Sequence, residues 1–126
     1  MRLLKVSYVD SERKGEPLVR YGFLIEHKKR LAKRVGLSNS DAPSIESAQL
    51  VSEAAALAEL FQYMVSNTDF SFIRGPEGEA CCHNAILLAD DSGGFVPVPY
   101  DFDRTGFVDP PNGLPDEALG QRNFRD

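Results

Sequence analysis

Cysteine and histidine are scarce in this chain of 126 residues, which holds only two of each. The cysteines, Cys81 and Cys82, are adjacent. We expect both to remain thiols, because a disulfide between neighbours closes a strained ring, and free thiols are typical of the cytoplasm. The cysteines also lack the spaced Cys and His partners of a zinc site, and two histidines are too few for a His-rich metal centre.

Long hydrophobic runs are absent as well. No apolar segment approaches the ~20 residues that a helix needs to span a bilayer. The first residues lack the apolar stretch and the small-residue cleavage site of a secretory signal. We therefore predict a cytoplasmic protein with no membrane partner.

Positive charge is sparse in the second half of the sequence. Residues 1–63 carry ten Lys and Arg against eight Asp and Glu, whereas residues 64–126 carry four against eleven. The acidic half suits a site for divalent cations better than a phosphate-binding surface. The basic run at residues 27–35 has no interleaved aromatic residue, so we expect no nucleic-acid partner.

An antiparallel hairpin is predicted at the N-terminus. Residues 3–9 and 18–26 are rich in apolar and β-branched residues, and a polar turn with Gly15 separates them. The nearly continuous apolar run at residues 21–25 is typical of a strand that is covered on both faces. Because two strands alone are marginally stable, we expect a homodimer, a segment preceding Met1, or exposed Leu, Val and Tyr side chains near residues 3–9.

Two helices are predicted next. Residues 27–35 form a short basic helix that ends at Gly36, with Leu31 and Val35 pointing inward. Residues 44–65 form a long helix whose apolar residues cover so broad a surface that we predict it to be central in the fold.

A second, smaller hairpin follows. Residues 85–89 and 95–100 read as strands around a tight turn at residues 90–94. Pro97 and Pro99 cannot donate ladder hydrogen bonds, which places the second strand at an edge.

The predicted fold class is therefore α+β. Residues 1–126 form one domain, in which an N-terminal antiparallel hairpin and a long central helix precede the small hairpin. Residues 109–126 are rich in proline and glycine and form a loop-rich tail.

Four oxygen-bearing side chains fall at the ends of these elements. Asp69 follows the long helix, Asn84 precedes the first strand of the small hairpin, and Asp101 and Asp103 follow its second strand. Because both open ends of a hairpin lie on the same side, we expect these side chains to converge. Carboxylate and amide oxygens are the ligands that Mg²⁺ and Mn²⁺ prefer, although each residue could instead serve as an ordinary turn residue.

The order of these elements resembles the catalytic half of protein-kinase-like folds. The motifs are similar to those of a group of uncharacterised bacterial proteins that distantly resemble atypical kinases of the CotH spore-coat and HipA types. They are Phe61-Gln62-Tyr63-Met64, Asn67-Thr68-Asp69-Phe70-Ser71, Cys81-Cys82-His83-Asn84 and Pro97-Val98-Pro99-Tyr100-Asp101-Phe102-Asp103-Arg104-Thr105-Gly106.

The resemblance implies a role for each of these positions. Asp69 would be the catalytic base-like Asp, and Asn84 and Asp101 would hold Mg²⁺ or Mn²⁺, with Asp103 as a further ligand. Backbone groups near Glu26 would face the adenine ring of ATP, as in a kinase hinge. The implied function is phosphoryl transfer from a nucleotide to an unknown acceptor.

The sequence also departs from the kinase pattern. Asp69 and Asn84 are 84 − 69 = 15 positions apart, against about five in protein kinases, so residues 75–78 must bulge out. No glycine-rich phosphate loop is present, and Lys5 is a poor candidate for the strand lysine. On this interpretation the chain is the hinge and C-lobe of a longer protein, or a truncated relative that is inactive. The alternatives are a non-catalytic protein-interaction remnant and a metal-assisted phosphoester hydrolase.

Overall fold

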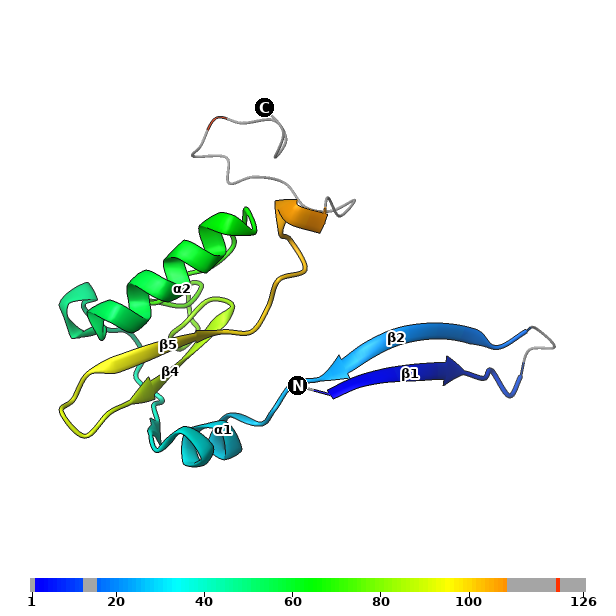
Figure 1. The fold of residues 1–126 in the computed structure, drawn as a ribbon, viewed down its shortest axis with the longest axis horizontal. Helices are drawn as coiled ribbons and strands as arrows, with labels where there is room; N and C mark the ends of the chain where they lie inside the picture. The colour runs from blue at the N-terminus through cyan, green and yellow to red at the C-terminus, as the bar shows by residue number, and fades with distance from the viewer. Residues whose placement is uncertain (1, 13–15, 109–119, 121–126) are drawn as a thin grey trace.

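A computed structural model describes residues 2–12, 16–108 and 120, so the tail predicted at residues 109–126 lies, except for Gly120, outside the described part. The described residues form two antiparallel sheets and two α-helices (Figure 1), which confirms the α+β class. Neither helix in this part of the chain is long and apolar enough to cross a membrane.

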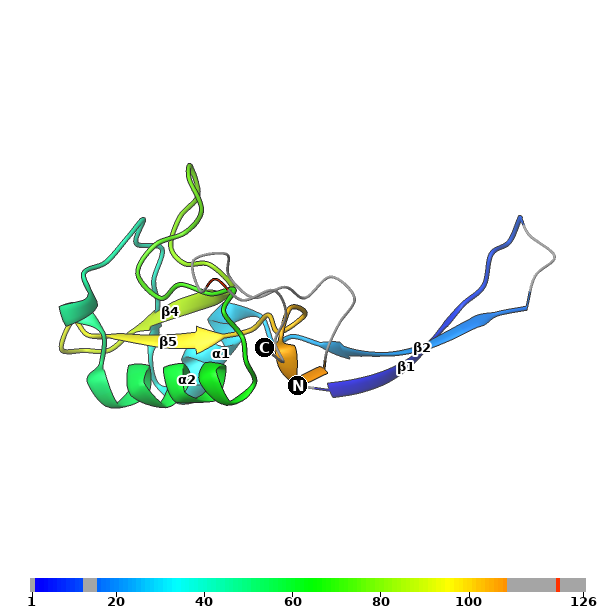
Figure 2. The same ribbon diagram turned by 90° about the horizontal axis from the view of Figure 1, so that it is seen from above.

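The first sheet is a two-stranded hairpin that extends away from the rest of the molecule (Figures 1 and 2). Strands β1 (Arg2–Tyr8) and β2 (Leu18–Leu24) pair antiparallel, with Lys5 opposite Tyr21. We call this hairpin the arm. The hairpin prediction is confirmed, and so is the expected exposure of apolar side chains at its first strand, where Leu3 is 72% exposed.

The prediction that residues 21–25 are covered on both faces is wrong. Tyr21 is 73% exposed and Ile25 58%, because no other described element packs against the arm. An apolar run signals burial only when the fold supplies a covering layer, and here neither face of β2 receives one.

Helix α1 (Lys28–Val35) follows the arm and ends as predicted. Gly36 adopts a left-handed conformation with φ 72°, and its N–H donates to the carbonyl of Ala32. Ala32 is buried and Leu31 half-buried, but Val35 is exposed, so the predicted inward position of Val35 is wrong.

The second sheet lies in the body of the molecule and has the order β3-β4-β5. Strand β4 (Ala85–Ala89) is central, and most of its side chains are buried. Strand β5 (Phe95–Pro99) forms an edge, as its two prolines predict. Strand β3 (Ser38–Asn39) was not expected, because two residues are too few to produce a sequence pattern.

The long helix is shorter than predicted. A 3-10 turn at Ser47–Gln49 precedes helix α2 (Ser52–Met64), whereas one helix was expected over residues 44–65. Ile45 lies outside any helix, and its N–H donates to the carbonyl of Ile73 at 3.0 Å. The N–H of Val51 donates to the carbonyl of Phe95 at 2.8 Å, which fixes the start of α2 against β5.

Helix α2 covers β5 with one side only (Figure 2). Ala55 and Gln62 are buried, whereas Leu57 is 70% and Met64 68% exposed. The prediction of a central helix is therefore wrong, since part of its broad apolar surface has no covering layer in the described residues.

Cys81 and Cys82 are joined by a disulfide, so the prediction that both remain thiols is wrong for this structure. The backbone around the pair is fixed by hydrogen bonds: the N–H of Cys81 donates to the carbonyl of Pro43, and the N–H of His83 donates to the carbonyl of Ser71. The segment between Asp69 and the cysteines projects from the body (Figure 2), as the long insertion predicted.

The turn between β4 and β5 is organised by one carboxylate. Asp90 accepts hydrogen bonds from the hydroxyl of Ser92 and the N–H of Gly94, both at 2.7 Å. The hydrogen bond from the Ser92 side chain, followed by that from the Gly94 backbone, lowers the pKa of Asp90 below its usual value.

This shift predicts a pH-dependent contribution to stability. Because the pKa of Asp90 is lowered on folding, its contribution is complete above the ordinary pKa of about 3.9 and is lost as the pH falls through the lower folded value. Asp90→Asn should therefore lower the melting temperature at pH 6, and the difference from wild type should shrink as the pH falls below about 4. Thermal melts over this pH range test the expectation. Asp91→Asn, at the exposed neighbouring position, is the control and should show no such convergence.

Candidate functional site

The open end of the β4–β5 hairpin brings two predicted site residues together. The N–H of Tyr100 donates to the carbonyl of Asn84 at 3.1 Å, so Asp101, the next residue, lies beside the start of β4. The chain after Asp101 then runs along the end of α2, where the N–H of Gly106 donates to the carbonyl of Ser66 at 3.0 Å. Three separate segments thus meet at one place.

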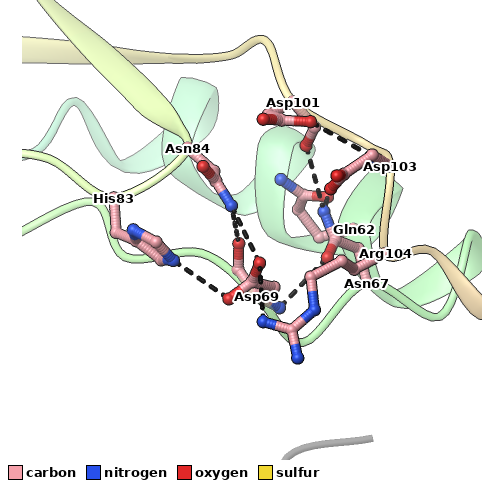
Figure 3. Close-up of polar contacts among 8 residues, drawn as sticks. All are labelled: Gln62, Asn67, Asp69, His83, Asn84, Asp101, Asp103 and Arg104. Carbon is pink, nitrogen blue, oxygen red and sulfur yellow. Dashed lines mark hydrogen bonds and ion pairs between the residues drawn. The ribbon is translucent and has the colours of Figure 1, made fainter. Parts of the chain in front are cut away.

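Asp69 is the centre of this meeting point (Figure 3). The Asn84 amide nitrogen donates to the backbone carbonyl of Asp69 at 2.7 Å and to its Oδ2 at 3.1 Å. His83 Nε2 lies 2.9 Å from Oδ1, and an Arg104 guanidinium nitrogen lies 3.4 Å from Oδ2. The Asp69 carboxylate is therefore oriented by an amide and by two side chains that can carry positive charge.

The backbone of Asn84 is adapted to this contact. Its φ of 54° lies in the left-handed region, which asparagine tolerates better than most residues. In this conformation the side-chain amide of Asn84 donates to Asp69, which lies 15 positions earlier in the sequence. The predicted proximity of Asp69 and Asn84 is thus found in the structure.

A buried amide pair connects Asp69 to Asp101. The side-chain oxygen of Asn67 accepts from the N–H of Asp69 at 3.0 Å, so its nitrogen must point the other way. That nitrogen donates to Gln62 Oε1 at 2.9 Å and to the backbone carbonyl of Asp101 at 3.4 Å. Asn67 is 4% and Gln62 0% exposed, so these hydrogen bonds are protected from water.

One buried donor, the side-chain nitrogen of Gln62, has no partner in this arrangement of hydrogen bonds. Because Gln62 Oε1 accepts from Asn67, Gln62 Nε2 must point away from it. This nitrogen is buried and has no hydrogen-bond partner among the described residues. Figure 3 shows it on the side of Gln62 that faces Asn84.

The two other predicted metal ligands differ in their surroundings. Asp101 is half-buried, and its Oδ1 accepts from the N–H of Asp103 at 3.2 Å. Asp103 itself is exposed. Within the described ranges, no three His, Cys, Asp or Glu side chains are grouped closely enough to hold a metal ion. A divalent cation at this place would need Asp101, Asn84 and oxygen atoms from a ligand, which is a combination that Mg²⁺ commonly accepts.

An apolar cavity of about 390 Å³ lies beside this site. It is bounded by the chain that connects the arm to α1, by α1 itself, by the β4–β5 hairpin and by the segment after it: Ile25, Glu26, Lys28, Leu31, Ile86, Val98, Pro99, Tyr100 and Phe102. Phe102 packs edge-on against Phe61 of α2, with ring centroids 5.6 Å apart. Because Phe102 directly follows Asp101, the cavity and the polar site adjoin.

Two ion pairs fix the connecting chain along the cavity. Arg34 donates to Glu26 through two nitrogen atoms, at 2.8 and 3.1 Å, and this contact lowers the pKa of Glu26. Lys28 donates to Asp41 at 2.7 Å and lowers the pKa of that carboxyl. The predicted binding position at Glu26 therefore lies on a wall that is anchored on both sides.

Several site residues were not assigned roles from the sequence. His83, Gln62 and Asn67 appeared only as parts of the motifs. The spacing of Asn67 and Asp69, two residues apart in a polar turn, is the one local signal that could have identified Asn67, because asparagine often bonds to the N–H two residues on.

Comparisons with protein-family models, with curated proteins and with solved structures find no match for this chain. The kinase-like resemblance therefore stays a prediction from the sequence motifs.

The buried amide pair predicts an energetic coupling. Asn67→Ala removes the donor to Gln62 Oε1 and should lower the free energy of unfolding by about 1–3 kcal/mol, the usual cost of an unsatisfied buried group. Gln62→Leu combined with Asn67→Ala removes both partners, so the double variant should be more stable than the sum of the single effects predicts. Urea unfolding of the four proteins measures this coupling, and strictly additive effects would contradict it.

Proposed function

We propose that this chain is a nucleotide-binding, kinase-like domain in which Asp69, Asn84 and Asp101 surround the site of phosphoryl transfer. The observation that carries the proposal is the apolar cavity and its position. It is bounded by the connector at Ile25 and Glu26 on one side and by β5 on the other, and it ends at Phe102, next to Asp101.

The cavity suits the base of a nucleotide. A flat purine ring needs apolar surfaces on its two faces and backbone groups at its edge, and a pocket of this size is within the usual range for small ligands. Leu31 and Val98 supply apolar walls, while the connector supplies backbone N–H and C=O groups at Glu26. A base bound there would direct the phosphates toward the polar site.

The polar site supports the other half of the proposal. Asp69 is held by Asn84 and His83 in a fixed orientation, which is what a carboxylate needs to accept a proton from an acceptor hydroxyl. Asp101 and the amide of Asn84 would hold Mg²⁺ or Mn²⁺ together with phosphate oxygens, and the cation would neutralise charge on the phosphates. Arg104 adds positive charge beside Asp69.

The first test fills the cavity. Leu31→Trp should raise the Kd for ATP, measured by calorimetry, by about tenfold or more, because the indole occupies the space of the base. Val35→Trp is the matched control, since it lies one turn later on the same helix, is exposed and does not border the cavity. Circular dichroism melts verify that both variants fold. An unchanged Kd in Leu31→Trp would remove the cavity from the proposal.

The second test concerns the cation. In wild type, Mg²⁺ should tighten ATP binding, and Asp101→Asn should abolish this enhancement while leaving metal-free binding unchanged. Asp91→Asn, in the exposed turn between β4 and β5, should behave like wild type. If Asp101→Asn keeps the full effect of Mg²⁺, Asp101 is not a ligand.

A second candidate function is a protein-interaction module without catalysis. The observation that favours it is the engagement of both Asp69 carboxylate oxygens by His83, Asn84 and Arg104, together with the exposed apolar arm. Calorimetry that detects no affinity for nucleotide or metal, together with self-association driven by the exposed apolar surface, would support this candidate. Release of phosphate from a simple phosphoester in the presence of Mg²⁺ would instead support the metal-assisted hydrolase.

A further inference from the structure

The arm presents two free strand edges. Within the described residues β1 and β2 pair only with each other, and the arm extends away from the body (Figures 1 and 2), so nothing in that part of the chain covers either edge. A long exposed edge with apolar side chains tends to pair with a strand of another chain, because its outward N–H and C=O groups lack partners. The question is which edge pairs, and with what.

One face of the arm is mainly apolar and open. The register places Leu3 opposite Phe23, Lys5 opposite Tyr21, and Ser7 opposite Val19 on this face. Its large apolar side chains are exposed by 72% at Leu3, 73% at Tyr21, 53% at Phe23 and 42% at Val19. On the β2 side, every large side chain of this face is apolar.

Strand β2 is complementary to itself. If two copies pair antiparallel with full overlap, the twofold axis passes at Tyr21, the central residue of Leu18–Leu24. Val19 then lies opposite the second copy's Phe23, and Leu18 opposite its Leu24. Arg20, the one charged residue of the strand, lies opposite glycine, so no like charges meet.

Strand β1 lacks this property. Full antiparallel overlap of two β1 strands centres on Lys5 and places it directly opposite the second copy's Lys5. Like charges directly opposite each other destabilise a strand pair. Charge complementarity therefore selects the β2 edge for self-pairing, and a twofold contact of this kind closes after two copies.

We propose that two copies of this chain associate through their β2 edges and form a four-stranded antiparallel sheet of order β1-β2-β2-β1, with Tyr21 beside the second copy's Tyr21 on the twofold axis. The pairing satisfies the outward backbone groups of β2 and gives Val19, Tyr21 and Phe23 apolar neighbours across the new strand pair, whereas on the β1 side only Phe23 has one, Leu3. It also raises the arm above the two-stranded size that is marginal in water. The association does not depend on nucleotide binding.

Light scattering after size exclusion tests the association over roughly a hundredfold range of protein concentration. The wild-type chain should pass from monomer to dimer. Tyr21→Glu should raise the dimer Kd by about tenfold or more, since it opposes two carboxylates on the axis while pairing favourably with Lys5 in its own arm. Leu3→Glu is the matched control: it has the same exposure and lies on the same face, but on the outer strand, and should keep the wild-type Kd.

A charge-swap experiment tests the register. Tyr21→Glu and Tyr21→Lys should each associate more weakly than wild type when alone, and an equal mixture should associate more tightly than either, because the axis then joins opposite charges. Because Tyr21→Lys faces Lys5 in its own arm, circular dichroism melts verify that both variants fold. The proposal is overturned if the wild-type chain stays monomeric at every concentration, if Leu3→Glu weakens association as strongly as Tyr21→Glu, or if the mixture fails to associate. Oligomers larger than a dimer would also overturn it. They would indicate that the β1 edge of one copy pairs with the β2 edge of the next, a contact that does not close after two copies.

Discussion

The hydrogen bonds between Asn84 and Asp69 are the contact on which the site depends. They join the segment after α2 to the start of β4, and they hold Asn84 in a left-handed conformation that few residues accept. Because β4 is the central and most buried strand, Asn84 at its start is held in place by the core. Its hydrogen bonds therefore orient the partly exposed carboxylate of Asp69. His83, the residue before Asn84, is placed against the same carboxylate by the same turn.

Much of the fold was predictable from local patterns. Both hairpins, helix α1 with its Gly36 cap, and the edge position of β5 follow from turn residues, alternation and prolines, which act over a few residues. The start of α2 was not predictable, because residues 44–51 have a helix-compatible composition but form backbone hydrogen bonds to segments far along the chain. Tertiary contacts outweigh propensity at such places.

The site was predictable only in part. Hairpin geometry alone places Asn84 beside Asp101, so their proximity could be foreseen. The roles of His83 and Gln62 could not, because neither a histidine shortly before a strand nor a glutamine near the end of a helix has a pattern that distinguishes a buried partner from a surface residue. The exposure of β2 was not predictable for a similar reason. An apolar run is typical of a buried strand, but the run itself does not show whether another element packs against it.

The unsatisfied nitrogen of Gln62 has a consequence for stability. An isolated buried donor costs about 1–3 kcal/mol, and the fold carries this cost. Because Gln62 is 0% exposed and does not border the apolar cavity, a molecule in that cavity would not reach this nitrogen, so the cost belongs to the packing of α2 itself.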